Sequence, residues 1–429
     1  MNVIYNIAIN AFNASLKLYA RFLPKNPRRK FPRFVRGRRG LLSRIETEMN
    51  AARAASSRPV VWFHSASLGE FQIARPLIKA LKQRGDCTVV MTFFSPSGYE
   101  GATAHNHEFI DHIFYLPLDT RRYARRFVEA LRPSAAVMMV SEYWPNTLQQ
   151  LKFHSVPTTL VSAVIRENSQ FFRWYGKIYR KSLSSFRRIF VLNEQSAFNL
   201  QMLGYTDAKV SGDPLFDNAA LVARTPWHNE AIERFCAGPQ PVFVAGSISD
   251  DTDAGIIAEV TRRNQDVKFI LVPHDISSRS IKACSRLLPE EPLVLSKCTG
   301  QTDMASSRIM IVDCVGILAY LYRKASWAYV GGGFTKLLHS VIEPVVYGVP
   351  VAFGPRIERK ITPLQLIDRG IGEKIESAAD LNIWLSRLKA DPELNDKLRA
   401  EALRYVDKNI GATQEIVEEI AQSVWPQHQ

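Results

Sequence analysis

The chain has 429 residues, of which 46% are hydrophobic and 22% are charged. This length is too great for one ordinary hydrophobic core and predicts two α/β domains. The five cysteines show no C-x-x-C spacing, so neither a disulfide framework nor a zinc site is expected. Residues 1–45 carry eleven Lys or Arg and no acidic residue, although the net charge of the whole chain is only +14. The basicity therefore belongs to one segment, which argues against nucleic acid as a partner.

The pattern of residues 1–24 predicts a helix that is apolar except for one polar stripe. Asn, Lys or Arg recurs at positions 2, 6, 10, 13, 17 and 21, and mostly apolar residues fill the remaining positions. Together with the basic run at 25–44, this pattern predicts a helix bound to an anionic membrane surface, with its charges on the cytoplasmic side. The helix lacks the ~20 unbroken apolar residues of a spanning segment. A helix packed on the domain remains the alternative.

Short apolar runs alternate with amphipathic stretches from residue 60 onward. Such runs between helices predict parallel sheets that are covered on both faces. We expect an α/β fold of two Rossmann-like domains whose parallel sheets face a cleft, with ligands at the carboxyl ends of the strands. The expected boundaries are 1–45 for the membrane-binding segment, 46–220 for the first domain and 221–429 for the second. The helices expected near 376–424 cap the second domain or cross back to the first. The expected strands are 60–64, 87–93, 135–140, 158–163 and 188–193, then 241–246, 268–273, 308–313, 327–332 and 350–354.

Two carboxylates follow strands in the first half and could frame a hydroxyl acceptor. Glu70 ends the segment HSASLGE (64–70), and Glu142 lies in SEYWPN (141–146). Spacing alone favours a solvated loop acid for Glu142. For Glu70 it favours a capping box, in which the carboxylate would accept a hydrogen bond from the Ser67 N–H. Gly69 is a poor choice for a first helical turn that serves stability only, which keeps a catalytic interpretation of Glu70 open.

The turn at 329–348 is the most unusual local sequence of the second half. Three glycines follow a strand, and a helix beginning near Leu338 or His339 would point free N–H groups at a ligand. Glu343 follows His339 by one helical turn and could accept hydrogen bonds from a ribose. The alternative is a tight turn with a capping histidine and a solvated glutamate. Further turns after strands, at 246–247, 273–274 and 316, would lie on the same rim.

Several segments resemble the signatures of the lipid A Kdo transferases, where Kdo is 3-deoxy-D-manno-octulosonic acid. The resemblance implies a GT-B fold and an inverting glycosyltransferase of lipopolysaccharide biosynthesis, with CMP-Kdo as donor and a lipid A precursor as acceptor. It also implies attachment to the cytoplasmic face of the inner membrane and a reaction that needs no metal or other cofactor. The segments are HSASLGE, SEYWPN, LVSAVIREN (160–168), VSGDPLFD (210–217), VAGS (244–247), LVPH (271–274), DCVGILAYLY (313–322) and GGGFTKLLHSVIEPVVYGVPVAFGP (331–355).

The resemblance also implies roles for individual residues. Glu70 matches the general base of the family. The acceptor would contact Ser65, Ser67, Gly69, Glu142 and Arg166. The donor would contact Ser247, Pro273, His274, Gly316, Gly332, Gly333, Phe334, Lys336, His339, Ser340 and Glu343.

The chain departs from the family pattern at a few positions. Leu337 and Leu338 stand where many members have glycines, and Ser340 stands where they have asparagine. Leu215 replaces a basic residue, and Lys336 could supply the missing charge. Three other functions therefore stay open: a sugar-nucleotide epimerase, a transferase that uses a UDP-sugar, and a non-catalytic nucleotide-binding membrane module.

Overall fold

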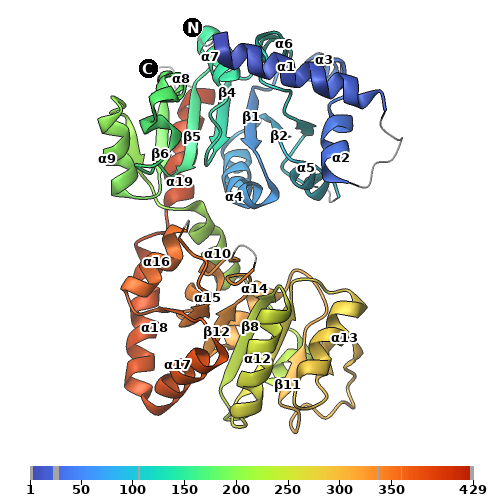
Figure 1. The fold of residues 1–429 in the computed structure, drawn as a ribbon, viewed down its shortest axis with the longest axis vertical. Coiled ribbons are helices and arrows are strands. Elements are labelled where there is room, and N and C mark those ends of the chain that lie inside the picture. The colour runs from blue at the N-terminus through green and yellow to red at the C-terminus, as the bar shows by residue number, and fades with distance from the viewer. Residues whose placement is uncertain (1–2, 23–28, 105–106, 336–337, 359, 426–429) are drawn as a thin grey trace. The chain divides into compact units, whose positions relative to one another are not determined.

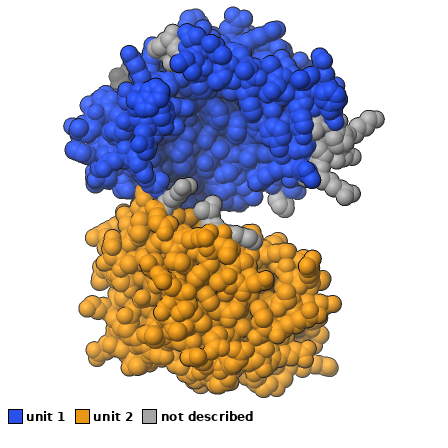
Figure 2. Space-filling model, viewed as in Figure 1, with its two compact units in different colours: residues 1–217, 409–429 blue, residues 218–408 orange. Residues whose placement is uncertain are grey.

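The computed structural model describes residues 3–22, 29–104, 107–335, 338–358 and 360–425. The chain divides into two units, residues 1–217 with 409–429 and residues 218–408, which Figure 2 shows in different colours. Each unit contains a seven-stranded parallel sheet with helices around it (Figure 1). The predicted fold class, α/β with two Rossmann-like domains, is confirmed.

The sheet of unit 1 has the strand order β3-β2-β1-β4-β5-β6-β7. Its three central strands are buried at every position. Helices cover both faces of the sheet, so the side chains on either face of these strands can be apolar. The five strands predicted for this unit are confirmed, and 158–163 matches β5 at both ends. The strands are β1 (Val60–Ser65), β2 (Thr88–Phe93), β3 (His112–Tyr115), β4 (Ala135–Met139), β5 (Thr158–Ala163), β6 (Arg188–Val191) and β7 (Ala208–Val210).

Helix α4 shows why the helices of unit 1 pack as they do. Its apolar residues at positions 71, 74, 77, 78 and 81 are all buried, since their spacing places them on one face. Ser67 caps the helix at its N-terminus. The helices of this unit are α1 (Val3–Ala20), α2 (Lys30–Gly37), α3 (Leu41–Ala55), α4 (Leu68–Arg84), α5 (Pro96–Thr103), α6 (Arg121–Leu131), α7 (Pro145–Phe153), α8 (Lys177–Leu183), α9 (Glu194–Met202) and α19 (Ala412–Val424), with short 3₁₀ turns at Gln170–Phe172 and Trp174–Gly176. Helix α10 (Pro214–Arg224) begins in unit 1 and continues into unit 2.

The end of the chain returns to unit 1, the alternative that the sequence left open beside the boundary of 221–429 for the second domain. Ile416, Val417 and Ile420 are buried on one face of α19 in the same cluster as the apolar face of α4. The Asp217 carboxylate accepts hydrogen bonds from the N–H groups of Gly411 and Thr413, at 2.5 and 2.7 Å, and so caps α19. The apolar face of a helix packs on whichever core lies next to it in space, and the order of residues along the chain does not show which core that is.

The sheet of unit 2 has the order β10-β11-β9-β8-β12-β13-β14. Its strands are β8 (Val242–Ile248), β9 (Lys268–Pro273), β10 (Leu293–Val294), β11 (Ile309–Ile311), β12 (Trp327–Val330), β13 (Val351–Phe353) and β14 (Gly372–Lys374). Its helices are α11 (Glu230–Phe235), α12 (Asp251–Arg263), α13 (Ser278–Leu287), α14 (Leu318–Leu321), α15 (Ile342–Val345), α16 (Ile361–Asp368), α17 (Ala378–Ala390) and α18 (Pro392–Asp407), with 3₁₀ turns at Leu295–Lys297 and Tyr322–Lys324.

The four strands that the sequence did not predict are β3, β7, β10 and β14, which are the edges of the two sheets. Edge strands are short and partly exposed, so they lack the continuous apolar run by which central strands are recognised. The five strands predicted for unit 2 are confirmed, and 268–273 matches β9 at both ends.

Helix α1 packs on unit 1 through its polar side. The Tyr5 hydroxyl donates to Asp119 Oδ2 at 2.7 Å, and Asn146 Nδ2 donates to Asn6 Oδ1 at 2.9 Å. Leu16 completes this inner side in a small buried cluster with residues 35 and 118. The outer side is apolar, with large side chains exposed at positions 3, 4, 7, 12, 18 and 19. Across the described residues, none of the helices is long and apolar enough to span a bilayer.

Candidate active site

Glu70 and Glu142 meet at the carboxyl end of the unit 1 sheet. Strand β1 pairs in parallel with β4, in the register His64 to Met138, so the segments that follow both strands emerge side by side. Glu70 lies in the first turn of α4, after β1, and Glu142 precedes α7, after β4. The pairing of β1 with β4 therefore brings together two acids that are 72 positions apart in the chain.

Glu142 is buried, with 6% of its surface exposed, and is not the solvated loop acid that spacing favoured. Its Oε2 atom lies 2.8 Å from His64 Nε2 and accepts a hydrogen bond from Trp144 Nε1 at 2.6 Å. The His64 Nδ1 atom faces Thr92, with Oγ1 at 2.8 Å and the carbonyl oxygen at 3.1 Å. A buried carboxylate needs such partners, because an unpaired charge inside a protein is costly.

Glu70 does not make the capping box that the sequence favoured. Ser67 Oγ accepts a long hydrogen bond from the Glu70 N–H, at 3.5 Å. The Glu70 carboxylate, however, accepts from the Ala66 N–H at 2.5 Å, one residue before the N–H that a capping box uses. Burial, and second the negative charge of Glu142, raise the pKa of Glu70 to about 7, against the opposing effect of the Ala66 N–H. A carboxylate with this pKa is suited to take up a proton near neutral pH.

The surroundings of these acids are strained and open. Val140, just before the Glu142 segment, has a φ of 59°, which is unfavourable for a β-branched residue. The buried Ser65 Oγ has no hydrogen-bond partner among the described residues. A side chain at Gly69 would meet only Ser67 Oγ, at 3.9 Å, so the glycine leaves free space beside Glu70. Arg166 follows β5, the neighbour of β4, and is exposed.

In unit 2, a buried carboxylate fixes the glycine-rich turn after β12. Asp253 accepts hydrogen bonds from the Tyr329 hydroxyl at 2.6 Å and from the N–H groups of Gly332 and Ser249, both at 2.9 Å. Gly332 has a φ of 95°, and a Cβ atom on Gly331 would lie 2.3 Å from the Ser247 carbonyl oxygen. The packing of this turn within unit 2 therefore requires glycine at both positions, whether or not a ligand binds there.

His274 and His339 come together at this turn. Their ring centroids are 4.5 Å apart, and His339 Nε2 lies 2.9 Å from Ser249 Oγ. Ser247 precedes them at the end of β8 with a φ of 55°, a strained value for a serine. Three of the predicted donor residues thus gather where β8 and β9 end, beside the turn after β12.

The predicted helix from Leu338 or His339 is wrong, since α15 spans only Ile342–Val345. The helix after Gly316 is equally short, Leu318–Leu321. A single turn develops little dipole, so neither of these helices provides the anion-binding N-terminus of a longer helix.

Glu343 is half-buried and is not the solvated glutamate of the alternative interpretation. Burial raises its pKa to about 7. Its charge in turn raises the pKa of the buried Tyr322 hydroxyl, second to the burial of that group itself. A Cβ atom on Gly246 would lie 2.1 Å from the same hydroxyl, so Tyr322 connects the region of Glu343 to the end of β8.

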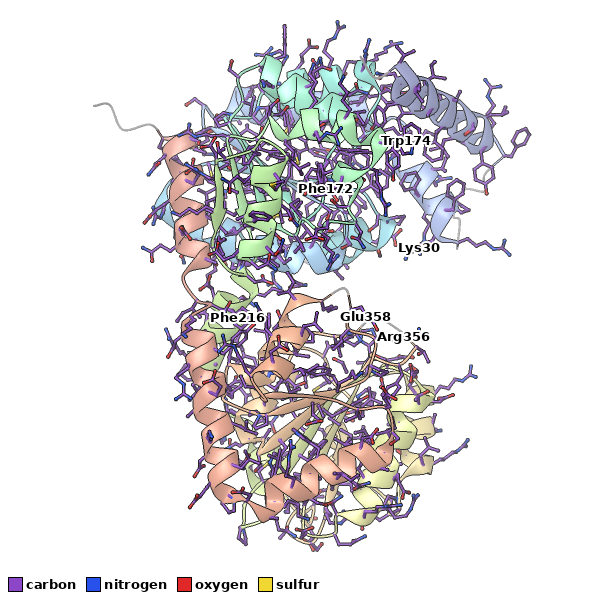
Figure 3. All side chains as sticks on the ribbon, turned by 60° about the vertical axis from the view of Figure 1, so that its left-hand side comes forward. Lys30, Phe172, Trp174, Phe216, Arg356 and Glu358 are labelled. Carbon is purple, nitrogen blue, oxygen red and sulfur yellow. The ribbon has the colours of Figure 1, made fainter. Side chains whose placement is uncertain are left out.

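The remaining predicted donor residues have varied surroundings. Pro273 and Gly333 are buried, Phe334 is half-buried, and Gly316 and Ser340 are exposed. Gly333 packs against the backbone of Gly354. Arg356, labelled in Figure 3, donates to the Thr335 carbonyl oxygen at 3.2 Å, beside the same turn. Lys336 and Leu337 lie outside the described residues.

Sequence reasoning missed His64, Trp144 and Asp253. His64 and Trp144 lie inside the quoted motifs HSASLGE and SEYWPN, so a search for partners of the two acids could have found them. Asp253 resembles an ordinary first-turn acid of α12, and no sequence signal separates it from Asp251. Among the residues described, there is no group of three His, Cys, Asp or Glu side chains placed to hold a metal ion.

Known structures share this two-unit architecture. The UDP-GlcNAc 2-epimerase of Neisseria meningitidis aligns with a TM-score of 0.60 and 15% identity, over 85% of this chain and 100% of that one. MurG of Acinetobacter baumannii aligns with a TM-score of 0.58 and 14% identity, over 85% and 99%. At such identities the likeness concerns the fold alone. The two parallel sheets and these neighbours define a GT-B protein.

Sequence comparison shows which transferases the chain resembles. A family model described as 3-deoxy-D-manno-octulosonic-acid transferase (kdotransferase) matches residues 36–218. The 3-deoxy-D-manno-octulosonic acid transferase of Haemophilus influenzae is 24% identical over 83% of this chain and 86% of its own length. The transferase of the same name from Aquifex aeolicus is 26% identical over 81% and 92%. Over most of its length the chain is thus similar to proteins named as Kdo transferases, which are glycosyltransferases.

We predict that Asp253→Ala destabilises unit 2 by about 3 kcal/mol or more, because it leaves a buried hydroxyl and two N–H groups without an acceptor, at ~1–3 kcal/mol each. Asp250→Ala removes the half-buried cap of the same helix, together with its contact to the Thr335 hydroxyl, and should cost only ~1 kcal/mol. Urea unfolding of both variants measures the difference. Equal losses would contradict a special role for Asp253.

Proposed function

We propose that this protein transfers Kdo from CMP-Kdo to a hydroxyl group of a lipid A precursor, at the cytoplasmic face of the inner membrane, as a step of lipopolysaccharide biosynthesis. The observation that carries the proposal is Glu70, a carboxylate with a pKa of about 7 in the first turn of α4, after β1. The activity by which the relatives are named supports Kdo as the transferred group. The other parts of the proposal rest on the resemblance of the motifs and on the outer side of α1.

The reaction needs one base in unit 1. Glu70 takes the proton of the acceptor hydroxyl while the hydroxyl oxygen attacks the anomeric carbon of Kdo. The bond from that carbon to the phosphate oxygen breaks, and CMP leaves with the electron pair. Attack from the side opposite CMP inverts the anomeric configuration. Base catalysis contributes roughly 10²–10⁴-fold and works best when the pKa of the base lies near the working pH.

The donor binds unit 2 in this proposal. The imidazoles of His274 and His339 lie together where strands end, which is where α/β sheets bind ligands. They replace the helix N-termini that we expected to stabilise the departing phosphate, because α14 and α15 are single turns. The raised pKa of Glu343 allows its carboxyl group to donate or accept a hydrogen bond to a ribose hydroxyl.

The outer side of α1 supports binding to a membrane surface. A soluble helix normally buries its apolar side, but α1 contacts unit 1 through Tyr5 and Asn6 and leaves Ile4 85% exposed. Unit 1 also exposes Trp174, with 92% of its surface accessible and labelled with Phe172 in Figure 3. Aromatic and apolar side chains of this kind partition into the lipid interface. Such binding would bring unit 1 to a lipid acceptor.

Mass spectrometry of a lipid A precursor incubated with CMP-Kdo and the protein tests the reaction. A mass increase of one or more Kdo units is expected. Epimerisation of a UDP-sugar without lipid, or transfer from a UDP-sugar, would instead support the alternatives from the same fold. Binding of CMP without any turnover would leave a nucleotide-binding module.

We predict that Glu70→Gln lowers turnover about 10²-fold or more while CMP affinity is retained, because glutamine keeps the shape of the glutamate side chain but cannot act as a base. Asn193→Ala is the matched control, since it removes only the side-chain cap of α9 and should cost ~1 kcal/mol of stability. Initial rates and calorimetric titration with CMP measure both quantities. Near-normal turnover of folded Glu70→Gln would exclude Glu70 as the base.

Activity should rise with pH, with a midpoint near 7, because Glu70 must be deprotonated to accept the proton. Glu142→Gln should move the midpoint of kcat/KM to lower pH, since it removes the negative charge that helps to raise the pKa of Glu70. Trp144→Phe removes a hydrogen bond of Glu142 but keeps its charge, so its midpoint should stay. A pH–rate profile that is the same in Glu142→Gln and the parent protein would refute this coupling.

Ile4→Asp should weaken binding to vesicles that contain phosphatidylglycerol by at least about tenfold. It removes an apolar side chain worth ~1.5–3 kcal/mol when buried and adds a charge of the same sign as the lipids. Asn10→Asp adds the same charge without removing an apolar group and should act more weakly. Vesicle sedimentation measures both variants. If Ile4→Asp binds no more weakly than Asn10→Asp, the apolar side of α1 does not insert.

A further inference from the structure

A pocket of about 390 Å³ lies beneath α1 in unit 1 and is separate from the acids of the candidate active site. We call it the α1 pocket. It lies where α1, the α2–α3 corner and the segment between β3 and α6 meet. Its size falls within the ~300–1,000 Å³ of ordinary ligand sites.

The floor of the α1 pocket is apolar. Leu16, Val35 and Leu118 form one buried cluster there, and Ala20 packs against it. Leu41 and Leu42 continue the floor from the start of α3. A floor of this kind favours a hydrocarbon chain over a hydrated ion or a sugar, because it offers no hydrogen bonds.

The rim of the α1 pocket is basic. It consists of Lys17, Arg21 and Arg39, and no acidic residue lines the pocket. The Arg126 guanidinium donates to both carboxylate oxygens of Glu46, so its charge is already balanced. Three exposed cations around an apolar floor attract an anion that carries an apolar chain.

Arg38 adds a positive charge in the wall of the α1 pocket. Its guanidinium donates to the carbonyl oxygens of Phe94, Leu116 and Phe34, at 2.7, 3.0 and 3.1 Å. These bonds use three of its five N–H groups, and none of the acceptors carries a charge. Burial lowers the pKa of Arg38 to about 9, so the group is still positive at neutral pH. An anion at the rim would partly balance this charge.

We propose that the α1 pocket binds one anionic phospholipid of the membrane surface, with an acyl chain on the apolar floor and the phosphate at the basic rim. A phospholipid fits better than a soluble phosphate because of the floor, and better than an uncharged chain because of the rim. The exposed outer side of α1 lies on the same helix as the floor residues Leu16 and Ala20, so a lipid reaches the pocket from the surface that α1 contacts. The inference rests on the membrane contact of the proposed function and is independent of the transfer reaction.

The test uses the full-length protein and short-chain lipids below their micelle concentration, so that no vesicle surface contributes. Dihexanoyl phosphatidylglycerol should bind at one site, several-fold more tightly than dihexanoyl phosphatidylcholine with the same chains. Inorganic phosphate should not saturate the site. Equal affinity for both lipids, or for phosphate alone, would overturn the proposal.

Two pairs of variants locate the site. Ala20→Trp fills the α1 pocket and should weaken binding of dihexanoyl phosphatidylglycerol at least about tenfold, whereas Ala8→Trp adds the same ring on the exposed part of α1 and should not. Arg39→Ala should weaken binding about fivefold, since a basic residue near an anionic group contributes ~1 kcal/mol. Arg29→Ala, exposed and outside the pocket, makes the same change of charge and should have no effect.

The outcomes are decisive in both directions. Unchanged binding in folded Ala20→Trp, or equal losses in Arg39→Ala and Arg29→Ala, would overturn the proposal. If circular dichroism shows that Ala20→Trp does not fold, the arginine pair alone decides. Failure of Kdo transfer with lipid binding intact would contradict the proposed function and leave the α1 pocket as a phospholipid site.

Discussion

The contact between His64 Nε2 and Glu142 Oε2, at 2.8 Å, holds the candidate active site together. It joins the ends of two neighbouring strands, and it does so in a buried place where electrostatic interactions are stronger than in water. The other nitrogen of His64 meets a hydroxyl and a carbonyl oxygen of Thr92. Burial first, and the charge of the Glu142 carboxylate second, raise the pKa of Glu70. The contact therefore fixes the position of a carboxylate that contributes to the pKa of the neighbouring acid.

Unit 2 uses a buried carboxylate in a different way. Asp253 is saturated by a tyrosine hydroxyl and two backbone N–H groups, so it has little capacity left for a ligand. Its effect is to hold the glycine-rich turn against β8. The two histidines and Glu343 lie around that turn, where we propose that the nucleotide binds. Glu142 helps to raise the pKa of a neighbouring carboxylate, whereas Asp253 shapes a loop.

Asp119 connects α1 to the segment that carries Glu142 within unit 1. Its carboxylate accepts from the N–H groups of Asn146 and Thr147, at 2.9 and 2.8 Å, and so caps α7, directly after Glu142 and Trp144. It also accepts from the Tyr5 hydroxyl of α1. Burial raises the pKa of Asp119, against these hydrogen bonds. The polar side of α1 thus serves in part to attach the helix to unit 1, which leaves the apolar side exposed.

The sequence by itself determined the two parallel sheets, because central strands such as 158–163 and 268–273 must be apolar on both faces. It also marked Glu70, Glu142, His274 and His339 as residues at strand ends. Tertiary structure alone decided the edge strands, the return of α19 to unit 1 and the burial of Glu142. The physical reason is that periodicity records which faces avoid water, but not which neighbour covers them. Burial and the charge of Glu142, 72 positions away in the chain, together raise the pKa of Glu70.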